Sequence, residues 1–177
     1  MSDIGYTHIY FGSGKGKTSA ALGLALRASG SGKDVVIVQF LKDWKCGELD
    51  SLALLPNVTV FRGKSSGGVF IRDMSEESKA ETMAIHNANL RKALDLQANG
   101  QCDLLILDEA VDAYQLGVLD SKMFENLLEN KPEPLELVIT GHRPDAQMLE
   151  RGDYVTEMVK HRHPYDKGVK ERRGIEF

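Results

Sequence analysis

Phe11-Gly-Ser-Gly-Lys-Gly-Lys-Thr-Ser19 stands between an apolar stretch and a segment with alanine and leucine at helical spacing. Its three glycines allow the backbone to wrap closely around a small anion. The helix that follows turns its free N–H groups and the positive end of its dipole toward the same point. Lys17 adds a mobile positive charge for phosphate oxygens, and Thr18 adds a hydroxyl suited to Mg²⁺. The segment therefore predicts a loop that binds a nucleoside triphosphate.

The spacing of this loop departs from the usual phosphate-binding pattern. That pattern places a glycine five residues before the glycine of Gly-Lys-Thr, and here Phe11 holds that position. Gly12 stands one position later, and Lys15 adds a second basic residue inside the loop. A glycine-rich linker is the alternative, but linkers do not lie between a buried strand and a helix. The shift indicates a nucleotide held differently from that of a standard ATP hydrolase.

Size and composition suit one globular domain spanning residues 1–177, with 42% hydrophobic and 27% charged residues. The formal net charge of -4 argues against a nucleic-acid-binding protein, which carries a basic excess or stripe. The sequence shows neither a targeting segment nor an apolar run that suits a membrane span, so we expect a cytoplasmic protein. Two cysteines make no disulfide framework; we expect Cys46 to be exposed in a polar loop and Cys102 to be buried.

Strand-like and helix-like patterns alternate along the chain. The expected strands are residues 6–11, 35–40, 58–61, 104–107, 135–140 and 154–158, and the expected helices are 17–29, 75–98, 121–129 and 144–150. This alternation predicts an α/β fold with a mostly parallel sheet and helices on both faces. Together with the phosphate loop it indicates the P-loop NTPase-like (RecA-like) arrangement. Residues 62–74 suit a mobile loop at the active site.

Polar segments follow several of the predicted strands, namely Gly12–Thr18, Gln39-Phe40, Asp108-Glu109 and Thr140–Arg143. Ligands of parallel sheets bind beyond the carboxyl ends of the strands, so these segments should gather on one edge. Carboxylates at the end of a buried strand beside a phosphate loop are able to hold Mg²⁺ or its water shell. Alternatively, Glu109 acts as a general base that activates a water molecule. The simpler alternative is a helix N-terminus at which the dipole favours acidic residues.

Three further basic residues are candidates for nucleotide contacts. Arg27 lies close to three helical turns beyond Lys17, so it either shares the nucleotide-facing side or is a solvated surface residue. His142 and Arg143 follow a strand end and either contact ribose or phosphate or form a turn before Pro144.

Other catalytic chemistry is not favoured by the sequence. His161 and His163, together with His142, have no cysteine or acidic partner at a ligand spacing, which argues against a histidine metal site. No Ser/His/Asp or Cys/His arrangement indicates a covalent nucleophile. We therefore expect the substrates to supply their own nucleophile.

Segments along nearly the whole chain resemble the P-loop ATP:corrinoid adenosyltransferases. They are Gly12–Ala21, Val38–Lys42 with Gly47-Glu48, Leu107–Glu109, Val138–Gly141, Asp153–Met158, Lys160-His161, Asp166–Val169 and Gly174–Phe177. The shifted phosphate loop and the terminal Gly-Ile-Glu-aromatic sequence are specific to that family. The resemblance implies transfer of the 5′-deoxyadenosyl group of ATP to the Co(I) centre of a corrinoid substrate, with release of triphosphate, in adenosylcobalamin biosynthesis or salvage.

The resemblance also implies that ATP lies reversed in the loop and that Co(I) is the nucleophile, so no protein base is needed. Thr18, Asp108 and Glu109 are the candidate Mg²⁺ ligands, and Lys17, Thr18 and Glu109 are the candidate catalytic residues. The candidate residues for binding ATP or the corrinoid are Gly12, Ser13, Gly14, Lys15, Gly16, Lys17, Thr18, Ser19, Arg27, Phe70, His142 and Arg143. A homodimer and an electron donor such as a flavoprotein are further implications.

Residues 66–74 depart from the family pattern. Relatives place a Phe/Trp pair in the segment that matches residues 66–74, where apolar rings crowd the lower face of the corrin. This chain has Phe70 there, and its single tryptophan, Trp44, lies in a different loop. Two other functions remain open: a P-loop ATPase or kinase that transfers phosphate, and a non-catalytic protein that binds ATP and corrinoid.

Overall fold

The fold is described by a computed structural model of residues 4–42, 45–63 and 75–175. Within these ranges six strands form one parallel sheet in the order β3-β2-β4-β5-β1-β6. The strands are β1 (Thr7–Phe11), β2 (Val35–Gln39), β3 (Val58–Arg62), β4 (Leu104–Asp108), β5 (Glu136–Thr140) and β6 (Tyr154–Glu157). The predicted parallel α/β architecture is confirmed.

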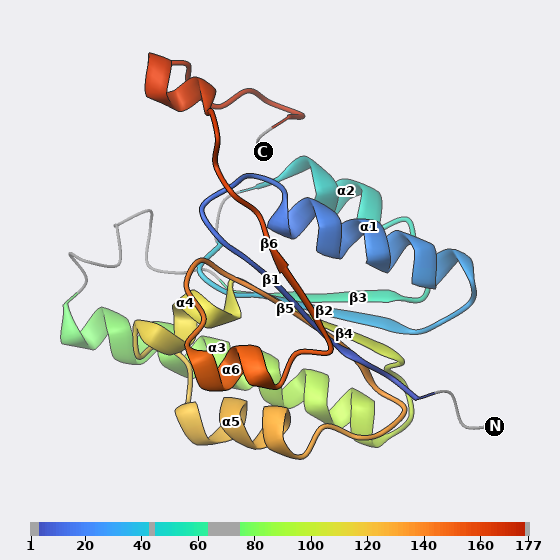
Figure 1. Cartoon of the computed structure of the whole chain (residues 1–177). Coiled ribbons are helices and arrows are strands. Elements are labelled where there is room, and N and C mark those ends of the chain that lie inside the picture. The colour runs from blue at the N-terminus through green and yellow to red at the C-terminus, as the bar shows by residue number, and fades with distance from the viewer. Residues whose placement is uncertain (1–3, 43–44, 64–74, 176–177) are drawn as a thin grey trace.

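Helices cover both faces of the sheet (Figure 1). On one face lie α1 (Lys17–Gly30) and α2 (Gly47–Leu52), and on the other lie α3 (Glu76–Ala98), α4 (Ala110–Gln115), α5 (Ser121–Glu129) and α6 (Ala146–Glu150). A 3₁₀ helix, η2 (Pro164–Lys167), stands away from the sheet in the C-terminal segment. The four expected helices are present with small shifts at their ends. The sequence did not predict α2, α4 or η2, which have six, six and four residues and show little helical periodicity.

The sheet has an apolar core on each side because successive side chains of a strand point to opposite faces. In β4, Leu104 and Ile106 pack in the core beneath α1, whereas Leu105 and Leu107 pack in the core shared with α3, α4, α5 and α6. All five residues of β2 and of β4 are buried, as the continuous apolar runs predict for central strands covered on both faces.

Strand register brings the polar ends of the strands to one edge. Gln39 of β2 is paired with Asp108 of β4, and Tyr10 of β1 is paired with Thr140 of β5. The loop after Phe11 therefore lies beside Asp108 and Thr140 at the carboxyl edge of the sheet. This is the edge at which the sequence predicted a ligand site.

The expectation for one of the two cysteines is wrong. Cys46 is 4% exposed, and it directly precedes the unpredicted helix α2 instead of lying in an open loop. Cys102 is buried as expected, and the two cysteines do not form a disulfide with each other. Burial raises the pKa of Cys102 to about 12, so it is an inert core thiol. Phe70 and Trp44 lie outside the described residues, and no helix in the described ranges is long and apolar enough to cross a membrane.

Candidate functional site

The glycines of the loop are required by a close approach of the chain that leaves β6. Gly12 has a φ of 108°, a left-handed conformation that favours glycine. The N–H of Gly14 donates to the carbonyl oxygen of Met158 at 2.6 Å. A Cβ atom would lie 2.5 Å from that oxygen at Gly12 and 2.7 Å at Gly14. The shifted glycine therefore stands where the C-terminal part of the chain crosses the loop.

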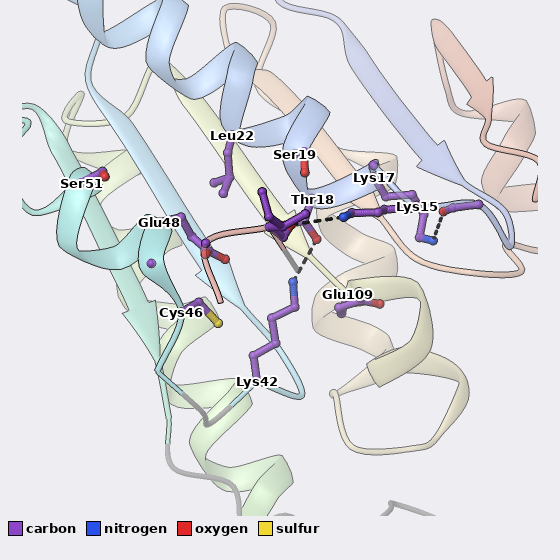
Figure 2. A pocket seen from close by; sticks show the side chains of 15 residues that line it. Lys15, Lys17, Thr18, Ser19, Leu22, Lys42, Cys46, Glu48, Ser51 and Glu109 are labelled. Carbon is purple, nitrogen blue, oxygen red and sulfur yellow. Dashed lines mark hydrogen bonds between the residues drawn. The ribbon is translucent and has the colours of Figure 1, made fainter. Parts of the chain in front are cut away.

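A cavity of about 580 Å³ opens beside the loop and the N-terminus of α1 (Figure 2). Its walls come from the loop and α1, the chain after β2, the start of α2, the residue after β4 and the C-terminal segment. The lining residues are Gly14, Lys15, Gly16, Lys17, Thr18, Ser19, Leu22, Lys42, Cys46, Gly47, Glu48, Ser51, Glu109, Gly174 and Ile175. The first-turn N–H groups of α1 have no acceptor within the helix, so this end of the cavity suits an anion.

The side chain of Lys17 curls back over the loop from which it starts. Its Nζ donates to the carbonyl oxygens of Gly12 at 2.8 Å and Gly14 at 3.1 Å, and the residue is buried. Lys17 therefore stabilises the shape of the loop and brings a positive charge to the wall of the cavity.

The carboxylate of Asp108 is the centre of a buried hydrogen-bond network. Its Oδ1 accepts from the hydroxyls of Thr18 at 2.9 Å and Thr140 at 2.8 Å. Its Oδ2 accepts from Nζ of Lys42 at 2.6 Å and, at 3.4 Å, from the amide of Gln39. Because Asp108 is fully buried, these donors offset the cost of removing its charge from water.

Lys42 is a site residue that the candidate list did not contain. Its Nζ donates to Oγ1 of Thr18 at 2.9 Å as well as to Asp108. Leu41, just before it, has a φ of 57°, which is costly for a residue with a branched side chain. The sequence feature that could have identified Lys42 was its position shortly after the end of a predicted strand.

Glu109 also adopts left-handed backbone, with a φ of 61°. Its N–H donates to Oγ1 of Thr140 at 2.9 Å, and its side chain lines the cavity. Burial and, next, the charge of Asp108 raise the pKa of Glu109 to about 7. Strained backbone and a shifted carboxyl at the wall of a cavity are features of functional sites.

His142 lies near Glu109 and contacts Asp112, a residue that the sequence analysis did not identify. Nδ1 of His142 is 3.1 Å from Oδ1 of Asp112 and 3.9 Å from Oε2 of Glu109. The N–H of His142 donates to Oδ2 of Asp112 at 2.9 Å. Asp112 is on α4, a helix too short to be read from the sequence, and no signal there pointed to it.

The C-terminal segment forms a further wall of the site. Nζ of Lys15 donates to the carbonyl oxygen of Ile175 at 3.1 Å, and the N–H of Lys160 donates to Oγ of Ser13 at 3.4 Å. A second cavity of about 350 Å³ lies between the loop, His142 and residues 163–172. The C-terminal part of the described chain therefore encloses the phosphate loop on this side.

The two candidate arginines line neither of these cavities. Arg27 is exposed in the last turn of α1, roughly 15 Å along the helix axis from Lys17. Arg143 is exposed, and its side chain lines neither cavity, although its carbonyl oxygen accepts a hydrogen bond from Gln115. Nucleotide contacts of these two arginines stay predictions.

The side-chain oxygen atoms at the inner end of the cavity are suitable ligands for a magnesium ion. Thr18 and Glu109 line the cavity, and Asp108 lies directly behind Thr18. Hydroxyl and carboxylate oxygens are the ligands that Mg²⁺ prefers. The ammonium group of Lys42 already lies against two of these side chains, so the structure tolerates a cation there.

Comparisons with known proteins give the same family over nearly the whole chain. Residues 3–177 match the family model described as ATP:corrinoid adenosyltransferase BtuR/CobO/CobP. The chain is 32% identical over 178 residues to the corrinoid adenosyltransferase CobA of Salmonella typhimurium and to the corrinoid adenosyltransferase of Escherichia coli K12. Each alignment covers 100% of this chain and 88% of the relative. The corrinoid adenosyltransferase of Pseudomonas aeruginosa is 29% identical, with 96% of this chain and 82% of the relative covered.

The contact between the loop and the chain leaving β6 can be tested with alanine at Gly14. The added Cβ would lie 2.7 Å from the backbone oxygen of Met158, which must shift to make room, so we expect the free energy of unfolding to fall by about 1–3 kcal/mol. Gly23 in α1 has nothing within 4 Å of an added Cβ, so Gly23→Ala is the matched control. That substitution should stabilise the protein by about 0.4–1 kcal/mol. Urea denaturation measures both, and equal effects would contradict the proposed close approach.

Proposed function

This chain belongs to the ATP:corrinoid adenosyltransferase family, as its motifs predicted, and we propose that it transfers the 5′-deoxyadenosyl group of ATP to the Co(I) centre of a corrinoid. Triphosphate is the second product. The observation that carries the proposal is the cavity beside Gly12–Thr18, where a loop specific to the family meets the first turn of α1. Lys15, Lys17 and Lys42 give this cavity the positive charge that a triphosphate requires.

The protein's part in the reaction is alignment and stabilisation of the leaving group. Co(I) is itself a strong nucleophile, so the attack on C5′ of the ribose needs no protein base. The N–H groups of the first turn of α1 and the ammonium of Lys17 bind the triphosphate and stabilise the charge that develops as it leaves. Holding C5′ in line with cobalt lowers the entropic part of the barrier.

Thr18 and Glu109 are the proposed Mg²⁺ ligands, and Asp108 orients the water shell of the metal. Bound Mg²⁺ supplies charge neutralisation for the triphosphate. The network around Asp108 fixes the hydroxyl of Thr18 through its 2.9 Å hydrogen bond, which supports this assignment. His142 lies 3.9 Å from Glu109 and 3.1 Å from Asp112, so a histidine–acid pair stands beside this proposed ligand.

The cellular setting is proposed from the family resemblance. We expect a cytoplasmic homodimer that acts in adenosylcobalamin biosynthesis or salvage. A separate electron donor such as a flavoprotein would supply the reduced corrinoid.

A single assay separates this function from the two alternatives. The protein is mixed anaerobically with ATP, Mg²⁺ and chemically reduced cobalamin, and the absorption spectrum of the adenosylated product is followed. Anion-exchange chromatography then quantifies the phosphate products. We expect adenosylcobalamin and triphosphate in equal amounts. Orthophosphate or ADP without adenosylated product would indicate phosphate transfer, and binding without turnover would indicate a non-catalytic protein.

Lys17→Ala tests the stabilisation of the leaving group. Removing one preorganised charged contact should lower turnover by about 10²–10³-fold. Lys122→Ala, which removes an exposed lysine on α5, is the control and should leave turnover unchanged. Near-full activity of Lys17→Ala would contradict the assignment of the phosphate loop.

Glu109→Gln tests the metal assignment, because it keeps the shape of the side chain and removes its charge. We expect the Mg²⁺ concentration for half-maximal activity to rise by about tenfold or more, since losing even an outer partner of a metal weakens binding that much. Asp108→Asn should raise it less, because Asp108 orients water. Titrating activity with Mg²⁺ measures both variants. An unchanged metal requirement in both would mean that these two acids are structural.

A further inference from the structure

The ammonium group of Lys42 lies between Thr18, a proposed metal ligand, and Asp108, the carboxylate proposed to orient the water shell of the metal. Its Nζ is 2.6 Å from Oδ2 of Asp108 and 2.9 Å from Oγ1 of Thr18. Figure 2 shows the lysine rising from the chain after β2 toward Thr18. The side chain of Lys42 is 12% exposed, and that of Asp108 is 0% exposed.

Lys42 and a metal ion compete for the same oxygen. A threonine hydroxyl has one proton and two lone pairs. Thr18 donates its proton to Oδ1 of Asp108 and accepts the N–H of Lys42 on a lone pair. A metal ligated by this oxygen needs a lone pair on the side facing the cavity, where the ammonium already lies. Two cations held so close would also repel each other strongly.

We propose that Lys42 is a displaceable cation that holds the place of Mg²⁺. It balances the buried charge of Asp108 and fixes the hydroxyl of Thr18 until ATP brings the metal. Lys42 then turns into the cavity that it already lines, where its flexible stem lets the ammonium meet a phosphate. The consequence is that free Mg²⁺ binds poorly and enters only together with the nucleotide. This inference rests on the assignment of Thr18 and Asp108 to the metal site.

The exchange keeps the site balanced in charge at every stage. A buried carboxylate that loses its partner is strongly destabilising, so Asp108 needs a cation whether or not the nucleotide is bound. The lysine supplies that cation in the free protein, and Mg²⁺ supplies it in the complex. A purely structural ion pair would stabilise the protein in the same way but would not control the entry of the metal.

The test measures binding of Mg²⁺ alone to the protein without nucleotide or corrinoid. Each variant is treated with EDTA, dialysed and titrated with MgCl₂ while its melting temperature is followed. Wild type should respond weakly. Lys42→Met should melt lower without Mg²⁺ and be stabilised by it. Its Mg²⁺ affinity should exceed that of wild type by at least about tenfold, because removing a unit charge a few ångströms away has an effect of that order or larger.

Three variants serve as controls. Lys42→Arg keeps the charge and should respond to Mg²⁺ as wild type does. The double variant Lys42→Met with Asp108→Asn should lose the new response, because the attracting carboxylate is gone. Lys79→Met removes a half-buried lysine that is 2.7 Å from Glu76 on α3, and it should leave the Mg²⁺ response unchanged.

The outcomes divide cleanly. A Mg²⁺ response of equal size in wild type and Lys42→Met, including no response in either, overturns the proposal. If Lys42→Met does not fold, Lys42→Gln is used, with Mn²⁺ binding measured by electron paramagnetic resonance as a second readout. Because neither substrate is present, failure here leaves the product assay for adenosyl transfer unaffected. Failure of that assay likewise leaves this metal measurement interpretable.

Discussion

The buried charge of Asp108 is the constraint on which the geometry of the site depends. The carboxylate is fully buried at the end of β4, so each of its oxygens must be paired. Those pairs reach Thr18 at the start of α1, Thr140 at the end of β5 and Lys42 after β2. One carboxylate therefore joins three segments that are far apart in the chain. Threonine hydroxyls have short stems and fix two of these segments, whereas the long, flexible stem of Lys42 allows its ammonium group to take other positions.

A second constraint acts on the loop from the opposite side. The chain that leaves β6 passes so close to Gly12 and Gly14 that no side chain fits between them. The same C-terminal chain then returns to the loop, where Lys15 meets the carbonyl oxygen of Ile175. The loop is thus held between Asp108 on the side of the sheet and Met158 on the outer side. This gives a physical reason for the displaced glycine: it stands where the crossing chain is closest.

The charges around the cavity suit a reaction in which a polyanion leaves. Lys15, Lys17 and Lys42 line it together with the first turn of α1, and Glu109 lines it beside Thr18. Glu109 carries a strained backbone and a pKa of about 7, raised first by burial and then by Asp108. Such a group is costly in the free protein, which is the expected condition of a carboxyl that functions with a cation. Leaving-group stabilisation and metal binding therefore draw on the same small set of residues.

Local sequence patterns determined the elements, the family and the main members of the site. Some patterns can be recognised within a short stretch of sequence: the apolar runs of β2 and β4, the helical spacing of α1 and the loop from Gly12 to Thr18. Short helices cannot, which is why α2 went unpredicted and Cys46 was wrongly expected to be exposed. Only the tertiary structure decided that Lys42 meets Thr18, that Asp112 meets His142, and that Arg27 lies away from the cavity. Periodicity and turn chemistry act between near neighbours, whereas these pairings depend on strand order and helix docking. Their energies exist only once distant segments are packed together.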